Sequence, residues 1–148
     1  LRCLVGSEMC IRDSMKYMLD TNICIYVIKH KPEAVIKRFF MHDPRELCIS
    51  SITYAELMYG VEKSQKVDKN RLAMMLFLSP ITILDFSARA AEEYGKIRAD
   101  LEKQGTPIGP MDMQIAGHAK AEELILVTNN TREFLRVKDL EVEDWTIE

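Results

Sequence analysis

The sequence lacks the signatures of several common protein classes. No run of about 18 apolar residues occurs in its 148 positions, which excludes a transmembrane helix. Only six glycines and three histidines are present. The glycines form no phosphate-binding loop, no His/Cys cluster has zinc-site spacing, and no serine lies in a Gly-x-Ser-x-Gly elbow. Nucleotide hydrolysis, a zinc centre and α/β-hydrolase chemistry are therefore not supported.

Basic residues and paired cysteines are scarce as well. The net charge of −3 argues against a protein that coats nucleic acid through bulk electrostatics. It does not exclude an enzyme that meets RNA at one site, because acidic metal ligands lower the net charge. The four cysteines have no paired spacing, and Cys24 and Cys48 lie in apolar stretches as expected of small core residues. We therefore expect a reducing, cytoplasmic location.

Length and composition predict one domain with a hydrophobic core, since 47% of the residues are hydrophobic. The stretch 3–13 resembles an in-frame translation of sequencing-adapter DNA. We therefore expect residues 1–14 to be a non-native extension, with the native chain starting at Met15. Residues 15–148 are expected to form a single domain.

Strand-like and helix-like segments alternate from Met15 onward, which predicts an α/β fold with a central, mainly parallel sheet between two layers of helices. The predicted strands are 16–19, 47–50, 81–84, 124–128 and a last one ending at Trp145. The predicted helices are 22–29, one starting at Pro32, 53–63, 68–78, one after Ser87, 112–122 and a short one at 131–137.

Four oxygen-bearing side chains lie near the ends of these strands or the starts of the helices. Asp20 follows the first strand, Asn130 follows the fourth, and Glu56 and Asp112 lie in the first turns of helices. In a parallel sheet, ligands bind at the carboxyl ends of the strands. Clustered carboxylates bind divalent metal ions, which promote phosphodiester hydrolysis. We therefore predict that Asp20, Glu56, Asp112 and Asn130 together form a metal-dependent catalytic site.

Each of these positions also has a purely local interpretation. Asp20 suits the N-cap of a helix, and Thr53 with Glu56 fits a capping box. Asp112 would benefit from the dipole of its helix, and Asn130 suits a turn. The order and placement of the whole set favour a metal site over four independent caps.

Two other readings compete with a nuclease. A receiver domain would need a phosphorylatable aspartate after a central strand, and Asp85 is the only candidate. A non-catalytic RNA- or protein-binding module would need none of the carboxylates. His118 lies six positions after Asp112, which puts it on the far side of that helix and outside the predicted site.

The ordered motifs resemble those of the PIN-domain ribonucleases and, more closely, the VapC toxins of bacterial type II toxin–antitoxin systems. The likeness covers Met15 to Trp145. It rests on Leu-Asp-Thr-Asn at 19–22, Glu-Leu at 56–57, Gly-Thr-Pro-Ile-Gly-Pro-Met-Asp at 105–112, Ile-Ala-Gly-His-Ala at 115–119, Val-Thr-Asn-Asn-x-x-Glu-Phe at 127–134 and Glu-Asp-Trp at 143–145.

This resemblance implies an endoribonuclease that requires Mg²⁺ or Mn²⁺, with metal bound at Asp20, Glu56 and Asp112. The fourth family position is often Asp but is Asn130 here, and Glu133 offers a further carboxylate. The enterobacterial-type branch cuts initiator tRNA, tRNA(fMet), in the anticodon loop. A catalytically weak PIN-like binding module is the alternative.

The resemblance also implies partners. Family members form homodimers and bind a VapB-type antitoxin whose tail blocks the active site. The chain offers apolar positions for such contacts at Met58, Tyr59, Met74, Met75 and Phe77. Residues of these types at helical spacing equally suit a hydrophobic core.

Overall fold

The computed structural model describes residues 14–147, so all but one residue of the predicted 1–14 extension lie outside the described part. A five-stranded sheet forms the centre, in the order β3-β2-β1-β4-β5. All four strand pairings are parallel, as the predicted α/β fold requires. The strands are β1 (Tyr17–Leu19), β2 (Leu47–Ser50), β3 (Thr82–Leu84), β4 (Ile125–Val127) and β5 (Val142–Glu143).

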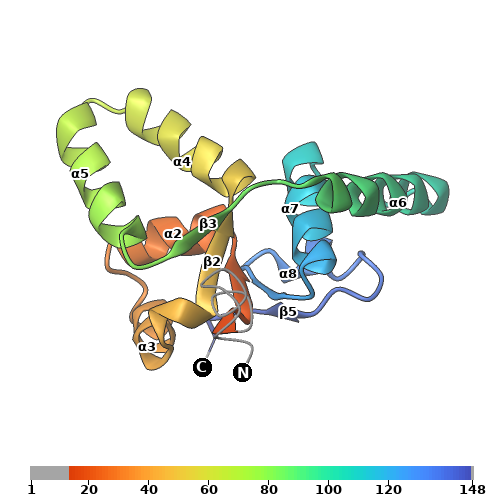
Figure 1. The fold of residues 1–148 in the computed structure, drawn as a ribbon, viewed down its shortest axis with the longest axis horizontal. Helices are drawn as coiled ribbons and strands as arrows, with labels where there is room; N and C mark the ends of the chain where they lie inside the picture. Colours follow the sequence, from red (N-terminus) through yellow and green to blue (C-terminus); the bar gives the residue numbers. More distant parts are fainter. Residues whose placement is uncertain (1–13, 148) are drawn as a thin grey trace, which may run out of the picture.

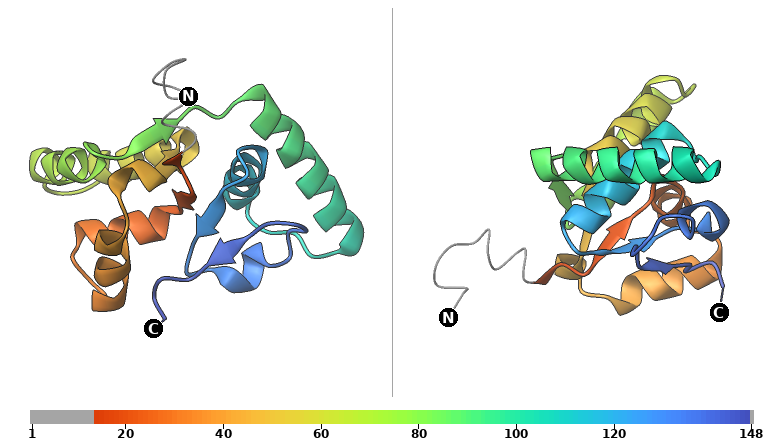
Figure 2. Two further views of the ribbon diagram at one scale, coloured as in Figure 1. Left: turned by 60° about the horizontal axis from the view of Figure 1, so that its bottom comes forward. Right: turned by 90° about the vertical axis from the view of Figure 1, so that its right-hand side faces the viewer.

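Helices cover both faces of the sheet (Figures 1 and 2). One face packs against α2 (Thr21–Ile28), α3 (Glu33–Met41), α4 (Ser51–Glu62) and α5 (Val67–Leu78). The other packs against α6 (Ala88–Gln104), α7 (Pro110–Ala121) and α8 (Thr131–Phe134), and a short 3₁₀ helix, η2 (Pro44–Glu46), precedes β2. Among the described residues, no helix is both long and apolar enough to cross a membrane.

The central strands are apolar on both sides because both sides are covered. In β1, Met18 packs into the core beneath α6 and α7, whereas Leu19 packs into the core beneath α2 to α5. Leu126 and Val127 of β4 divide between the two cores in the same way. Near-continuous apolar strands are expected where a parallel sheet is buried on both faces.

The start of α4 differs from the prediction. Ser50, in an extended conformation at the end of β2, caps the helix by accepting a hydrogen bond from the Ile52 N–H at 3.1 Å. The helix therefore begins at Ser51, two residues earlier than predicted. Thr53 lies inside the helix, so the predicted capping box with Glu56 is wrong, and Glu56 belongs to the second turn.

Several other boundaries also differ from the prediction by a few residues. The α7 helix starts at Pro110, so Asp112 lies in its first turn but does not open it. Gly105 ends α6 with a φ of 72°, the left-handed conformation that glycine adopts easily.

The last strand stops at Glu143. Trp145 lies beyond it, fully buried, with its indole N–H donating to the Glu143 carboxylate at 3.0 Å. Cys24 is fully buried, as predicted of a core residue.

Candidate active site

Asp20 is a buried carboxylate at the point where β1 ends and α2 begins. Its side chain is 5% exposed. Oδ1 accepts a hydrogen bond from the Thr21 N–H, and Oδ2 accepts one from the Thr128 hydroxyl, both at 2.8 Å. Burial raises the pKa of Asp20, the two hydrogen bonds oppose this, and the charge of Glu56 adds a further rise. The carboxylate is thus held in one orientation from two sides.

Glu56 projects from the second turn of α4 toward the same place. Its Oε1 accepts a hydrogen bond of 2.8 Å from the hydroxyl of Thr21, which lies 35 residues away in sequence. Thr21 therefore links the two carboxylates, because its backbone N–H donates to Asp20 and its hydroxyl donates to Glu56. Sequence reasoning did not assign a role to Thr21. The signal that could have revealed it is its place directly after the aspartate in Leu-Asp-Thr-Asn.

Asp112 lies in the first turn of α7 and is partly buried. Its pKa is raised to about 6, mainly by burial and then by the negative charges of Asp20, Glu133 and Glu56. A negative charge raises the pKa of a carboxyl group appreciably only when it lies close to that group. The folding of α7, α8, α4 and the end of β1 therefore brings four carboxylates from distant parts of the chain together.

Asn130 joins this group through Glu133 and Thr128. Its side-chain amide donates to Oε2 of Glu133 at 3.0 Å, and its backbone N–H donates to the Thr128 hydroxyl at 3.0 Å. Thr128 in turn donates to Asp20. The structure thus brings together all four predicted residues, with Glu133 as an additional carboxylate.

The charge of this acidic site is not balanced by the protein. Within residues 14–147, none of the carboxylates of Asp20, Glu56, Asp112 and Glu133 forms a salt bridge with a lysine or arginine. A buried or partly buried carboxylate without a cationic partner is costly. In this part of the chain, no three His, Cys, Asp or Glu side chains are already arranged to hold one metal ion. The donors fit a divalent cation by chemistry and charge, and the side chains would have to close around it.

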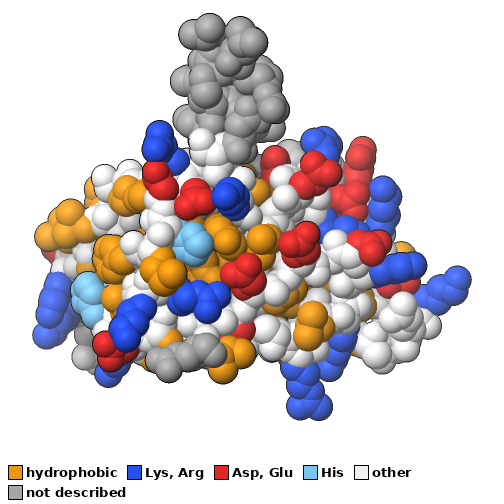
Figure 3. Space-filling model, turned by 90° about the horizontal axis from the view of Figure 1, so that it is seen from below, with side chains coloured by type: hydrophobic (Ala, Val, Ile, Leu, Met, Phe, Trp, Pro, Cys, Tyr) orange, Lys and Arg blue, Asp and Glu red, His pale blue; other side chains and the backbone are white. Residues whose placement is uncertain are grey.

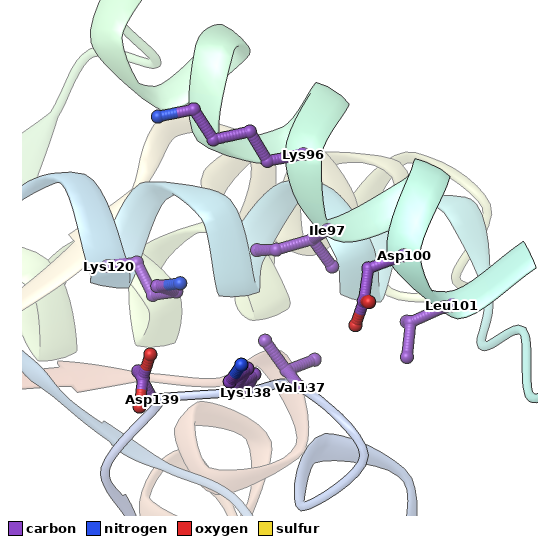
Figure 4. A pocket seen from close by; sticks show the side chains of 8 residues that line it. All are labelled: Lys96, Ile97, Asp100, Leu101, Lys120, Val137, Lys138 and Asp139. Carbon is purple, nitrogen blue, oxygen red and sulfur yellow. The ribbon is translucent and has the colours of Figure 1, made fainter. Parts of the chain in front are cut away.

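Two hollows elsewhere on the molecule contain none of the predicted residues. The first, of about 150 Å³, lies between α6, α7 and the loop after α8 (Figure 4). It is lined by Lys96, Ile97, Asp100, Leu101, Lys120, Val137, Lys138 and Asp139. The second, of about 300 Å³, shares Lys120 and Asp139 with it. Both mix acidic and basic groups, in contrast to the acidic site.

The chain is similar to proteins of one family over most of its length. The PIN domain family model matches residues 17–140. The tRNA(fMet)-specific endonuclease VapC of Shigella flexneri is 53% identical over 132 residues, which are 89% of this chain and 99% of that protein. Ribonuclease VapC2 of Haemophilus influenzae strain Rd is 51% identical over 131 residues, 88% of this chain and 98% of that protein.

Solved structures agree with this likeness. The DNA-bound VapBC of Salmonella typhimurium has a chain that is 48% identical, with a TM-score of 0.84, over 88% of this chain and 98% of its own. The VapBC2 structure from Rickettsia felis, bound to a promoter DNA fragment, gives 44% identity and a TM-score of 0.82 over 88% and 99%. Because the matched fold, the sequence identity and the coverage all point the same way, the chain belongs to the PIN domain family of metal-dependent nucleases, among the VapC ribonucleases.

Proposed function

We propose that the protein is the toxin of a VapBC toxin–antitoxin pair, a Mg²⁺-dependent endoribonuclease that cleaves tRNA(fMet) in the anticodon loop. The observation that carries the proposal is the group of four carboxylates with no lysine or arginine partner among the described residues. Relatives that are about half identical in sequence are named tRNA(fMet)-specific endonucleases, which supports the substrate.

Asp20, Glu56 and Asp112 are the proposed metal ligands. Mg²⁺ and Mn²⁺ prefer carboxylate oxygens, and each carboxylate oxygen has two lone pairs. Asp112 has a pKa of about 6, so cation binding would favour the ionised form that binding requires. When bound, the ion lowers the pKa of a water molecule and stabilises negative charge on the scissile phosphate.

The remaining groups orient these ligands. Thr128 and the Thr21 N–H hold both oxygens of Asp20, and the Thr21 hydroxyl holds one oxygen of Glu56. Glu56 retains a second oxygen that can complete the ligand set or orient the attacking water. Asn130 is a neutral member, and its amide restrains Glu133. In-line attack would leave a 5′-phosphate and a 3′-hydroxyl.

A VapB-type antitoxin is the proposed partner, since structural relatives are described as VapBC complexes. The helices α3, α4 and α5 expose apolar side chains that support such an interface and a homodimer: Phe40, Met41, Tyr59, Leu72, Met75 and Leu76. Of the positions considered from the sequence, Tyr59 and Met75 are exposed, whereas Met74 is buried in the core. The face seen from below in Figure 3 carries both basic and acidic side chains.

RNA cleavage by the purified, antitoxin-free chain tests the proposal. Total RNA is incubated with the wild type and with Asp20→Asn, with Mg²⁺ or with EDTA, and cut sites are mapped by primer extension. We expect one metal-dependent cut in the anticodon loop of tRNA(fMet). Asp20→Asn should lower the rate by at least roughly 10³-fold, because it removes a metal ligand. Its circular dichroism spectrum should match that of the wild type.

Two results would contradict the proposal. Cleavage that survives in clean Asp20→Asn protein would exclude the acidic site as the catalytic site. Folded wild-type protein that cuts no RNA with either Mg²⁺ or Mn²⁺ would favour the RNA- or protein-binding module instead.

A further inference from the structure

His118 is a buried titratable side chain that the proposed function leaves unused. It lies on α7, six residues after Asp112, and is fully buried. Its Nδ1 lies 2.8 Å from the hydroxyl oxygen of Ser50, which is 68 residues away in sequence. Its Nε2 has no hydrogen-bond partner among residues 14–147. Burial lowers the pKa of His118, which favours the neutral ring.

Ser50 occupies the junction of β2 and α4, where Figure 1 shows the helix beginning as the strand ends. Its fully buried side chain accepts the hydrogen bond from the Ile52 N–H that caps α4. A hydroxyl group can donate and accept at the same time. The single oxygen of Ser50 therefore connects the first turn of α4 to His118 on α7.

Two further contacts join the same region. The N–H of Phe86, in the segment after β3, donates to the hydroxyl of Ser51 at 3.0 Å. The Phe86 ring meets the His118 ring edge-on, with centroids 5.6 Å apart and an interplanar angle of 81°. The start of α4, the segment after β3 and the last turn of α7 are thus held as one unit.

The helix α7 is also fixed by α6. A Cβ atom added to Gly117 would lie 2.7 Å from the backbone nitrogen of Tyr94 and 3.0 Å from the backbone oxygen of Ala90. Only glycine permits the two backbones to approach this closely. The turn of α7 that carries His118 is therefore held between α6 and the start of α4.

We propose that His118 is a positioning residue whose hydrogen bond to Ser50 sets the separation of Glu56 on α4 and Asp112 on α7. The inference rests on the proposed function of the acidic site. Each carboxylate lies six residues from its end of the hydrogen bond, about 9 Å along the helix axis. A small rotation of either helix therefore displaces its carboxylate. A displacement of about 1 Å can lower the rate of an enzymatic reaction by about 10²-fold.

The test compares His118→Asn with His118→Leu. Asparagine keeps a polar atom near the position of Nδ1, whereas leucine has almost the same size without that atom. Ser50→Ala removes the other end of the hydrogen bond. Two quantities are measured per folded molecule: Mn²⁺ affinity by titration calorimetry on the RNA-free protein, and the single-turnover cleavage rate.

We expect His118→Leu and Ser50→Ala each to weaken both quantities by about ten- to hundredfold. His118→Asn should stay within about threefold of the wild type. The double variant should be no worse than Ser50→Ala alone, because Ser50→Ala already removes the contact with His118 together with the cap on the Ile52 N–H. The control Val137→Ala removes buried side-chain volume away from this contact. It should lower the stability and leave the Mn²⁺ affinity unchanged.

The possible results separate the two proposals. If folded His118→Leu binds Mn²⁺ and cleaves RNA as the wild type does, the positioning role is overturned and the proposed function stands. Equal impairment of the Leu and Asn variants would also overturn it, since packing rather than the hydrogen bond would then matter. A wild type that neither binds Mn²⁺ nor cleaves RNA would overturn the proposed function and this inference with it.

Discussion

Replacing Asp112 by asparagine is predicted to stabilise the metal-free protein while it abolishes RNA cleavage. Asparagine has nearly the shape of aspartate but carries no charge. In the native state the pKa of Asp112 is raised to about 6 by burial and by the charges of Asp20, Glu133 and Glu56. The ionised carboxylate is therefore less favourable in the folded chain than in the unfolded chain, and Asp112→Asn removes this penalty.

The size of the effect follows from the pKa shift of Asp112. A rise from 3.8 to about 6 is about 2 pKa units, or about 3 kcal/mol at about 1.4 kcal/mol per unit. Because the side chain is only partly buried, solvent screening reduces this to roughly 1.5–3 kcal/mol. Between these pKa values the native state holds more protons than the unfolded state. Wild-type stability therefore falls as the pH rises from about 4 to about 6.

Urea unfolding in EDTA, followed at several values between pH 4 and pH 8, measures the difference between Asp112→Asn and the wild type. We expect almost no difference near pH 4 and a gain of roughly 1.5–3 kcal/mol at pH 7. For a chain of this length that gain raises Tm by roughly 3–12 °C. The control is Glu92→Gln on the exposed side of α6, which should change the stability little at any pH.

Adding Mg²⁺ should reverse the order of stability. The wild type gains RT ln(1 + [Mg²⁺]/Kd), whereas Asp112→Asn lacks a ligand and gains little. A stability difference that does not change with pH would refute the reasoning, because it could not come from the ionisation of Asp112. A variant less stable than the wild type at pH 7 would refute it as well.

Two more predictions test the packing and the hydrogen bonds around the site. Gly117→Ala should lower the free energy of unfolding by about 1–3 kcal/mol, because the added Cβ meets the α6 backbone. The control Gly95→Ala faces open space on α6 and should raise the free energy of unfolding by about 0.5–1 kcal/mol. Equal effects of the two variants in urea unfolding would contradict this. Thr21→Val keeps the side-chain volume but removes the hydroxyl that donates to Glu56, and it should slow single-turnover cleavage by roughly tenfold or more. A wild-type rate would show that Glu56 needs no such restraint.

The fold could be predicted from the sequence because its strands are buried on both faces and its helices alternate with them. That pattern is local, and it identified each strand of the parallel sheet. The placement of Asp20 and Asn130 could be predicted for the same reason, because both follow strands whose ends share one edge. Parallel topology then places them together without any knowledge of the contacts.

The hydrogen-bond partners of Glu56 and His118 could not be predicted from local sequence. Thr53 and Glu56 fit a capping box by spacing, but Ser50 caps the helix and the hydroxyl of Thr21 holds Glu56. His118 falls outside the predicted site because its helical phase points away from Asp112. That phase is what turns the ring toward Ser50. The partners in these two contacts are 35 and 68 positions apart in the sequence. No short sequence window contains either pair.

The N-cap role of Asp20 and its role in an acidic site are not alternatives. Capping fixes the carboxylate, since Oδ1 accepts from the Thr21 N–H while Oδ2 accepts from Thr128. Each of these oxygens uses one lone pair in this way and keeps another. The free lone pairs belong to a side chain whose orientation is already set. A cation that binds there meets a ligand that has little conformational freedom left to lose, which is how a local helix cap can also serve a metal site.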